Sequence, residues 1–162
     1  MESTTAHTTT VISSNELLNH WQGHRNLTRR ILAAFPEKDF FEFTIAGMRT
    51  PAQLAAELLS MGAPAVKGIA KKQEEQFNES AVNFTTQEAY LQKWDEATDE
   101  INTYWSEIKD EDFGQTFNLF GAYNFPVIQN MLYLIDNEIH HRGQLYVYLR
   151  ALGIQPPFFW ER

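Results

Sequence analysis

The residues best suited to chemistry gather near the C-terminus of this chain. The segment 135–150 contains Asn137, Glu138 and the adjacent histidines His140 and His141, although its apolar residues predict a core helix. Burying such polar groups costs free energy unless they are paired or bound to a metal. The cluster therefore needs an explanation, and a metal site is one.

His141 is the histidine that we expect to face the core. Helical spacing places it close to the apolar stripe of its segment, with Asn137 one turn earlier on the same side, whereas His140 points about 100° away. Glu138 and Arg142, at the other edge of the stripe, are predicted to pair with each other. From this helix alone, a core histidine bonded to a carbonyl or a carboxylate is an equally good interpretation of His141.

Two other predicted helices could bring polar groups to His141. His24 lies in the middle of the apolar face of the first, with His20 at its edge, and Glu57 lies beside the apolar stripe of the second. Imidazole and carboxylate together suit Zn²⁺, Ni²⁺ or Fe²⁺. His20 and His24 also have the spacing of a two-ligand pair, but the glutamate of the zinc-protease motif is absent.

The composition limits the class of protein. Its 162 residues, 43% of them hydrophobic, fit one globular domain with a core. The chain has no cysteine, so any metal would need nitrogen and oxygen ligands. The formal charge of −8 argues against a nucleic-acid partner, because phosphate contacts need clustered Lys and Arg. The one basic cluster, Arg25 with Arg29 and Arg30, is interpreted as a solvated helix flank.

Neither a membrane-spanning segment nor a signal peptide is expected. The N-terminus lacks the basic-then-apolar pattern of a signal peptide, and no apolar run approaches membrane-spanning length. A cytoplasmic protein is the simplest expectation for a chain without cysteine.

Capping residues and hydrophobic spacing predict four long helices after a loose polar tail at residues 1–12. The helices are expected at residues 13–35, 50–70, 85–108 and 126–152. They predict an all-α four-helix bundle over residues 13–162, with an extra short helix or loop before the last helix.

The remaining segments are expected to be irregular. Residues 40–47 indicate an extended apolar linker without a partner strand, and the aromatic-rich residues 113–125 indicate a loop. Gly62 and Pro64 should kink or break the second helix. The connections are longer than a simple up-down bundle needs, so the topology could include crossovers.

Several segments resemble one protein family. Asn137–Gln144, followed by Tyr148–Ile154, resembles the final helix of the DinB/YfiT-like family. Ala46–Leu54 resembles the start of that family's second helix, and with the first-helix stretch His20–Thr28 the resemblance covers nearly the whole chain from Ser13. It implies a four-helix bundle, often dimeric, with a metal held by three histidines.

The resemblance also implies where the metal ligands fall. One histidine would come from the second helix and two from an HxxxH pair on the last, at the positions of Glu57, Asn137 and His141. Of these three residues, only His141 is a histidine, as the family pattern requires. Glu57 could ligate through oxygen, whereas the amide of Asn137 is a poor ligand for a transition metal. His24 could substitute from the first helix.

Two hypotheses for function follow. In the first, Glu57, Asn137 and His141 bind a divalent metal, zinc or nickel before iron. The protein would then be a metal-dependent thiol transferase or hydrolase acting on a small thiol or electrophile. Asn137 would orient water or substrate, and His24 would be a general base. Related proteins of this superfamily use a divalent ion to lower the pKa of a thiol.

The second hypothesis is a non-enzymatic module. It is a homodimeric bundle with a degenerate metal site that serves in binding or interaction. The aromatic residues of 117–125 and 158–160 would then supply its interface.

Overall fold

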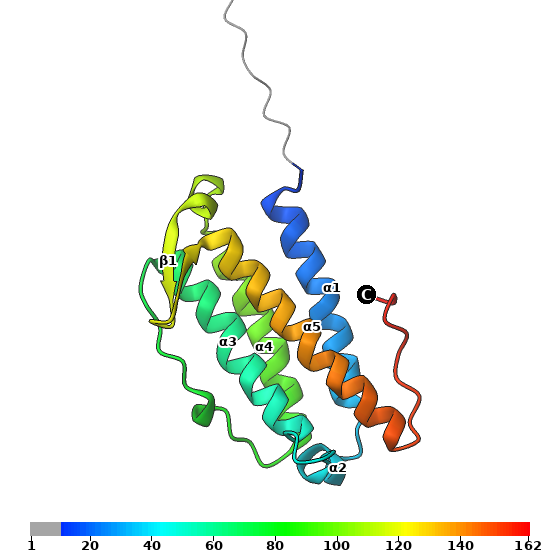
Figure 1. Cartoon of the computed structure of the whole chain (residues 1–162). Helices are drawn as coiled ribbons and strands as arrows, with labels where there is room; N and C mark the ends of the chain where they lie inside the picture. The colour runs from blue at the N-terminus through cyan, green and yellow to red at the C-terminus, as the bar shows by residue number, and fades with distance from the viewer. Residues whose placement is uncertain (1–10) are drawn as a thin grey trace, which may run out of the picture.

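Four long helices build the protein, as the sequence predicts. The structure is a computed structural model that describes residues 11–162, so most of the predicted tail at residues 1–12 lies outside the described part. The long helices pack side by side in a bundle (Figure 1). They are α1 (Ser14–Ala33), α3 (Pro51–Lys71), α4 (Gln87–Trp105) and α5 (Val127–Ala151).

Local capping explains where these helices begin. Ser13 and Glu16 form a reciprocal capping box at the start of α1, and Thr50 and Gln53 form another at the start of α3. Each satisfies backbone N–H groups that have no partner within the helix. At the other end of the chain, Gly153 follows α5 with φ of 75°, a backbone conformation that glycine adopts easily.

The bundle core contains the predicted apolar faces. Three tryptophans, Trp21, Trp94 and Trp105, are almost fully buried between the helices. Helix α1 turns one apolar face to the core, and Phe35, just after the helix, extends it; the buried members are Leu17, Trp21, Thr28, Ile31, Leu32 and Phe35. Their burial supplies the main driving force for packing α1 against α4 and α5.

Helix α3 is not broken at Gly62 and Pro64. It continues from Pro51 to Lys71 as one helix, and residues on most of its sides are buried. A Cβ at Gly62 would already contact the side chains of Arg25, Ile101 and Trp21, so the glycine allows close packing there. Tertiary packing around α3 thus offsets the hydrogen bond lost at the proline.

A short helix replaces part of the linker that was expected to be irregular. Residues Glu37–Glu42 form a short helix, α2, where an extended linker was predicted from residue 40 on. Proline before it and acidic residues in its first turn favour a helix start, and Phe40 is buried in the core. Single turns of 3-10 helix, Glu79–Ala81 and Asp110–Gly114, lie in the connections.

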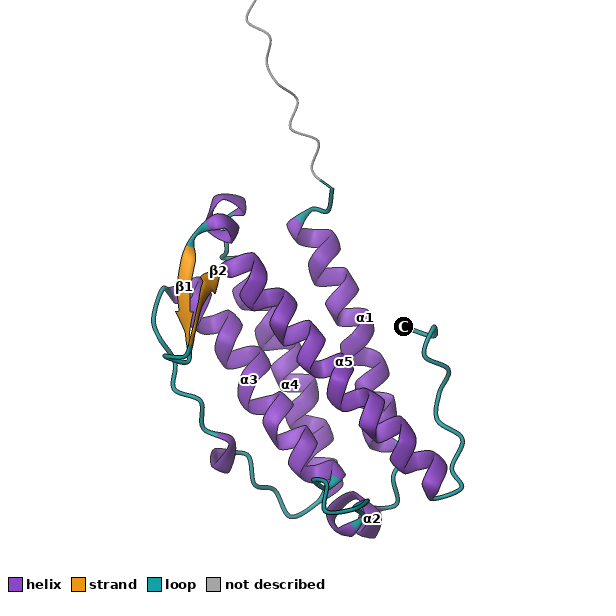
Figure 2. Ribbon diagram, in the orientation of Figure 1, coloured by secondary structure: helices purple, strands orange, loops and turns teal. Residues whose placement is uncertain are grey.

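Much of the aromatic-rich segment before α5 is a β-hairpin, so the prediction of a loop at residues 113–125 was wrong. Strands β1 (Thr116–Leu119) and β2 (Tyr123–Pro126) pair antiparallel, with Phe117 opposite Phe125. Figure 2 shows the hairpin at one end of the bundle, beside the start of α5. Its turn is formed by Phe120 and Gly121, which both have positive φ, as tight hairpin turns require.

Two further segments lie on the outside of the bundle. The linker at residues 72–86 leaves the end of α3 and runs back along that helix (Figure 1). The C-terminal tail returns along α1, where Arg30 donates hydrogen bonds to both the carbonyl and the carboxylate of Glu161.

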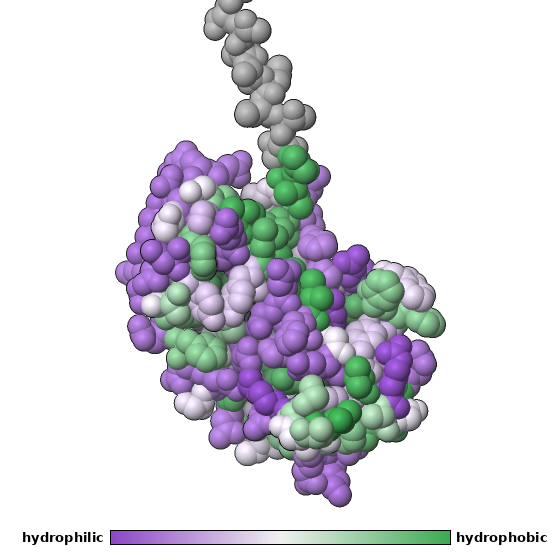
Figure 3. All heavy atoms as spheres, in the orientation of Figure 1, coloured by the Kyte–Doolittle hydropathy of each residue, from purple (hydrophilic) through white to green (hydrophobic). Residues whose placement is uncertain are grey.

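Hydrophilic and hydrophobic side chains are mixed over the face that contains α3 and α5 (Figure 3). Within residues 11–162, none of the helices is long and apolar enough to cross a bilayer.

Candidate functional site

The structure brings Glu57, Asn137 and His141 together between α3 and α5. Oε1 of Glu57 lies 2.9 Å from Nε2 of His141 and 3.4 Å from Nδ2 of Asn137. Asn137 and His141 are one turn apart on α5, so their side chains share the face that meets α3. His140 is exposed, as its predicted direction required.

Arg49 completes this cluster from just before α3. Its guanidinium pairs with the carboxylates of Glu57 and Glu79 and donates to the carbonyl of Gln53 at 2.8 Å. The hydroxyl of Tyr148 donates to the Arg49 carbonyl at 2.9 Å, which ties this segment to α5. The sequence analysis missed Arg49 and Glu79, because neither lies on an amphipathic face. Arg49 precedes Glu57 by about two helical turns, and this spacing was the available signal that the two side chains could meet.

The charges of the cluster favour an ionised pair. The hydrogen bond from His141, with further help from Arg49, lowers the pKa of Glu57 to about 2, so its carboxylate is charged at neutral pH. Burial opposes protonation of His141, but hydrogen bonds with Glu57 and Gln144 outweigh it and raise the pKa of His141 above its usual value. Both ring nitrogens of His141 face acceptor oxygens, at 2.9 Å and 3.3 Å, which suits an imidazolium.

A cavity of about 380 Å³ opens beside Glu57. Its walls come from α3, from the linker, from the hairpin and from α5. Two carboxylates and four aromatic side chains line it: Glu57, Glu79, Phe77, Phe120, Tyr123 and Tyr133. Volumes of this size are typical of small-molecule sites, and we refer to this space as the aromatic cavity.

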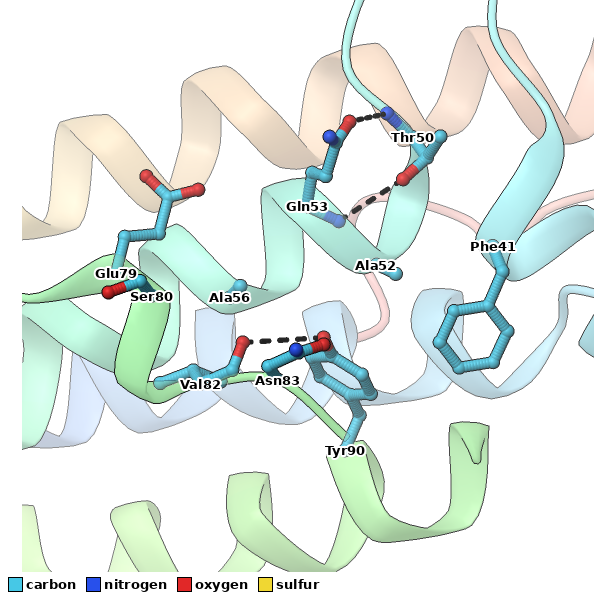
Figure 4. A pocket seen from close by; sticks show the side chains of 10 residues that line it. All are labelled: Phe41, Thr50, Ala52, Gln53, Ala56, Glu79, Ser80, Val82, Asn83 and Tyr90. Atoms are coloured by element: carbon cyan, nitrogen blue, oxygen red, sulfur yellow. Dashed lines mark hydrogen bonds between the residues drawn. The ribbon is translucent and has the colours of Figure 1, made fainter. Parts of the chain in front are cut away.

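A second cavity, of about 520 Å³, is lined by residues of α2, of the start of α3, of the linker and of α4 (Figure 4). Glu79 lines both cavities. The polar groups around the second one serve mainly structural hydrogen bonds: Thr50 and Gln53 cap α3, and the hydroxyl of Tyr90 donates to the carbonyl of Val82 at 3.5 Å. The aromatic cavity, which has the charged cluster in its wall, is therefore the stronger candidate site.

His24 lies in a different cluster. Its Nδ1 is 2.8 Å from Arg142 and its Nε2 is 3.1 Å from both His20 and Arg162, between α1, α5 and the C-terminal tail. Burial, followed by the positive charge of Arg142, lowers the pKa of His24 to about 4, so the imidazole is neutral at pH 7. The structure thus separates His24 from Glu57, and its role as a general base stays a prediction.

Glu138 does not pair mainly with Arg142, contrary to the prediction. It accepts hydrogen bonds from the indole of Trp21 at 2.9 Å and from the hydroxyl of Thr28 at 2.7 Å, and it lies 3.8 Å from Arg25. Arg142 donates instead to the carbonyl of His24 at 3.2 Å. Partners on α1 outcompete the neighbour one turn away, because they are fixed around the buried carboxylate.

Arg25 also corrects the prediction of a solvated basic flank. Only 2% of it is exposed, and its guanidinium lies 4.3 Å from the ring centroid of Trp94. Arg29 and Arg30 are half-exposed and pair with Asp95 and Glu161. The three arginines therefore do not form one surface cluster.

The donor set of Glu57, Asn137 and His141 does not fit a tightly held transition metal. Two ligand atoms that each lie about 2.1 Å from one ion, with an angle of about 90° between them at the ion, are about 3 Å apart. The distance between the Glu57 carboxylate and the His141 ring would therefore allow a shared ion. A zinc site, however, uses at least three strong donors, and the third group here is an amide. Arg49 also places a positive charge on the same carboxylate, which opposes a dication. In residues 11–162 no three His, Asp or Glu side chains form a metal-binding group.

Fold and site together define a class: a four-helix bundle with a charged cluster between its second and fourth long helices, covered by a hairpin and a linker. A family model described as the DinB family matches residues 2–161, so the chain belongs to the DinB family. The resemblance found in the sequence is thereby confirmed.

Individual relatives agree with this assignment. The chain is 26% identical to the uncharacterized protein YjoA of Bacillus subtilis (strain 168) over 153 residues, which covers 92% of this chain and 97% of that protein. Crystal structures of two DinB-like proteins share the fold. One, from Bacillus cereus ATCC 10987, has a TM-score of 0.74 at 19% identity and covers 90% of this chain and 97% of that one. The other, YjoA of Bacillus subtilis, has a TM-score of 0.70 at 18% identity and covers 91% and 100%.

Proposed function

We propose that this protein binds a small organic molecule in the aromatic cavity and that it does so without a resident transition metal. The observation that carries the proposal is the pairing of Arg49 with Glu57. A guanidinium on this carboxylate supplies the positive charge that a metal would otherwise bring. The carboxylate is then stabilised and remains a fixed negative group in the cavity wall.

The competing function is the metal-dependent thiol transferase or hydrolase that the family resemblance implies. It is favoured by the 2.9 Å between Glu57 and His141, a separation that two ligands of one ion would have. It needs Arg49 to leave Glu57 and the amide of Asn137 to act as a ligand. The two functions therefore differ in what Arg49 does.

Metal content separates the two functions. We would measure it by elemental mass spectrometry on protein purified without a His-tag, and follow Zn²⁺ binding by calorimetry. We expect well under one metal ion per wild-type chain, and tighter Zn²⁺ binding in Arg49→Leu, because Glu57 is freed. Lys67→Leu, which removes a surface partner of Glu75, is the matched control and should leave Zn²⁺ binding unchanged. Near-stoichiometric metal in the wild type that is lost in His141→Ala would instead establish the metal-dependent function.

Binding itself is tested with a library of small neutral and charged fragments. On isotope-labelled protein, we expect fragments to shift the backbone amide signals of Glu57, Phe120 and Tyr133 together. Signals near Tyr90, in the second cavity, provide the internal control. A library that leaves the first group unchanged would contradict the proposal.

A further inference from the structure

The charged side chains that line the aromatic cavity are both acidic. Glu57 and Glu79 both line it, and Arg49 is shared between the two carboxylates. Arg49 and His141, the cationic partners of these carboxylates, are not among the residues that line the cavity, so the wall itself presents negative groups to a ligand. The formal charge of −8 for the whole chain adds a field that attracts cations.

Four aromatic side chains line the cavity together with these two carboxylates. The rings of Tyr123 and Tyr133 lie 4.7 Å apart between centroids, and those of Phe77 and Phe120 lie 5.8 Å apart. The faces of aromatic rings attract cations, most strongly where water is excluded. Carboxylates together with several rings are the combination that recognises an organic ammonium group.

The hairpin turn holds one of these rings at a conformational cost. Phe120 has φ of 55°, which is rare for a bulky side chain, and Gly121 follows with φ of 70°. The hairpin is tied to the linker by a hydrogen bond from Asn118 to Glu74 at 3.0 Å. Strained residues are concentrated at ligand-binding sites, where the surrounding structure maintains them. The turn therefore places the ring of Phe120 beside that of Phe77 in the cavity wall.

We infer that the ligand of the aromatic cavity is a small organic cation, an amine or quaternary ammonium compound with apolar substituents. The inference rests on the proposed function and names its ligand class. The cationic group would lie among the rings, near Glu79 and Glu57, and the apolar substituents would contact Met61 and Ala122, which also line the cavity.

Three probes of nearly the same shape test the charge requirement. They are choline, its carbon analogue neohexyl alcohol, and the tert-butylacetate anion, each added at constant ionic strength to wild-type protein. We expect choline to shift the signals of the cavity residues with a dissociation constant about tenfold lower than that of neohexyl alcohol. The anion should bind more weakly than either.

A matched pair of variants tests the aromatic requirement. Phe77 lines the cavity and is 45% exposed, whereas Phe125 lies on the same hairpin as Phe120, does not line the cavity, and is 49% exposed. Both substitutions to Leu should therefore fold. We expect Phe77→Leu to weaken choline binding several-fold and Phe125→Leu to leave it unchanged; Glu79→Gln should weaken choline but not neohexyl alcohol.

The possible failures are distinct. Neohexyl alcohol binding as tightly as choline would overturn the cation inference and leave the proposed function standing. Equal effects of Phe77→Leu and Phe125→Leu would also overturn it. If none of the probes and no library fragment shifts the cavity signals, both the inference and the proposed function fail.

Discussion

Helix α5 carries two charged clusters on neighbouring faces, and the two clusters differ in how their carboxylates are enclosed. Toward α1, Glu138 is enclosed by Trp21, Thr28 and Arg25, and both Glu138 and Arg25 are 2% exposed. Toward α3, His141 meets Glu57, whose side chain is 17% exposed and lines a cavity. The first cluster is closed by protein groups, and the second leaves room for another molecule.

The difference shows how to separate structural from functional charges. A carboxylate with all its hydrogen bonds filled inside the core stabilises the packing of α1 on α5, because loss of one partner leaves the other unpaired. A carboxylate at a cavity wall keeps a solvent-facing side through which it can act on a ligand. Burial combined with an adjoining cavity, rather than charge alone, marks the candidate site.

The largest expected effect is on the Glu138 face. Glu138→Gln would leave the buried Arg25 without its counter-charge, and we expect a loss of about 3–5 kcal/mol in the free energy of unfolding. Urea denaturation monitored by tryptophan fluorescence measures this loss. Glu57→Gln should cost less, about 1–2 kcal/mol, because its site is partly solvated.

The double variant Arg25→Met/Glu138→Gln provides the control, since it removes both charges and should recover much of the stability. An equal cost for Glu57→Gln and Glu138→Gln would break the comparison, because the two faces would then be structurally equivalent.

A smaller effect, on pH dependence, is expected at the Glu57 face. The depressed pKa of Glu57 contributes stability that is complete above its usual value of 4.5 and is lost as the pH falls through about 2. The raised pKa of His141 contributes stability that is complete below its usual value of 6.5 and is lost as the pH rises through the raised value. The pair therefore stabilises the fold most between these two usual values.

Stability of the wild type and of Glu57→Gln, measured as a function of pH, checks this window. The difference in unfolding free energy should be greatest near pH 5 to 6 and decline on both sides. The variant Glu100→Gln, which removes a half-exposed partner of Lys93, should differ little from the wild type at every pH. A difference for Glu57→Gln that grows steadily above pH 7 would show that His141 is not the main partner.

The sequence was sufficient for the fold wherever the signals were local. Caps at Ser13 and Thr50, and Gly153 after α5, placed helix ends within a few residues. The hairpin was missed because its aromatic residues were interpreted as a loop, although Gly121 between short alternating segments is a turn signal. The break offered at Pro64 does not occur, because the packing around α3 cannot be inferred from a single segment.

The site was predictable only in part, for a similar reason. Helical spacing correctly directed His141 and Asn137 inward, and it placed Glu57 beside its own apolar stripe. Spacing cannot say which inward groups meet, so His24 was grouped with them although it faces the C-terminal tail. The pairing of Glu138 was wrong because its partners lie more than a hundred positions away in the chain.

The smallest expected effect comes from an ion pair that belongs to neither face. Arg29 and Asp95 form a bidentate pair at 2.6 and 2.8 Å, but their side chains are 39% and 50% exposed. We expect Asp95→Asn to cost at most about 1 kcal/mol, and less in high salt, because exposed charges are screened. Chemical denaturation at low and high salt, beside Glu138→Gln, measures both effects. A loss of stability as large as that of Glu138→Gln would mean that burial does not determine how much each carboxylate contributes to stability. The distinction between the two faces of α5 would then lose its physical basis.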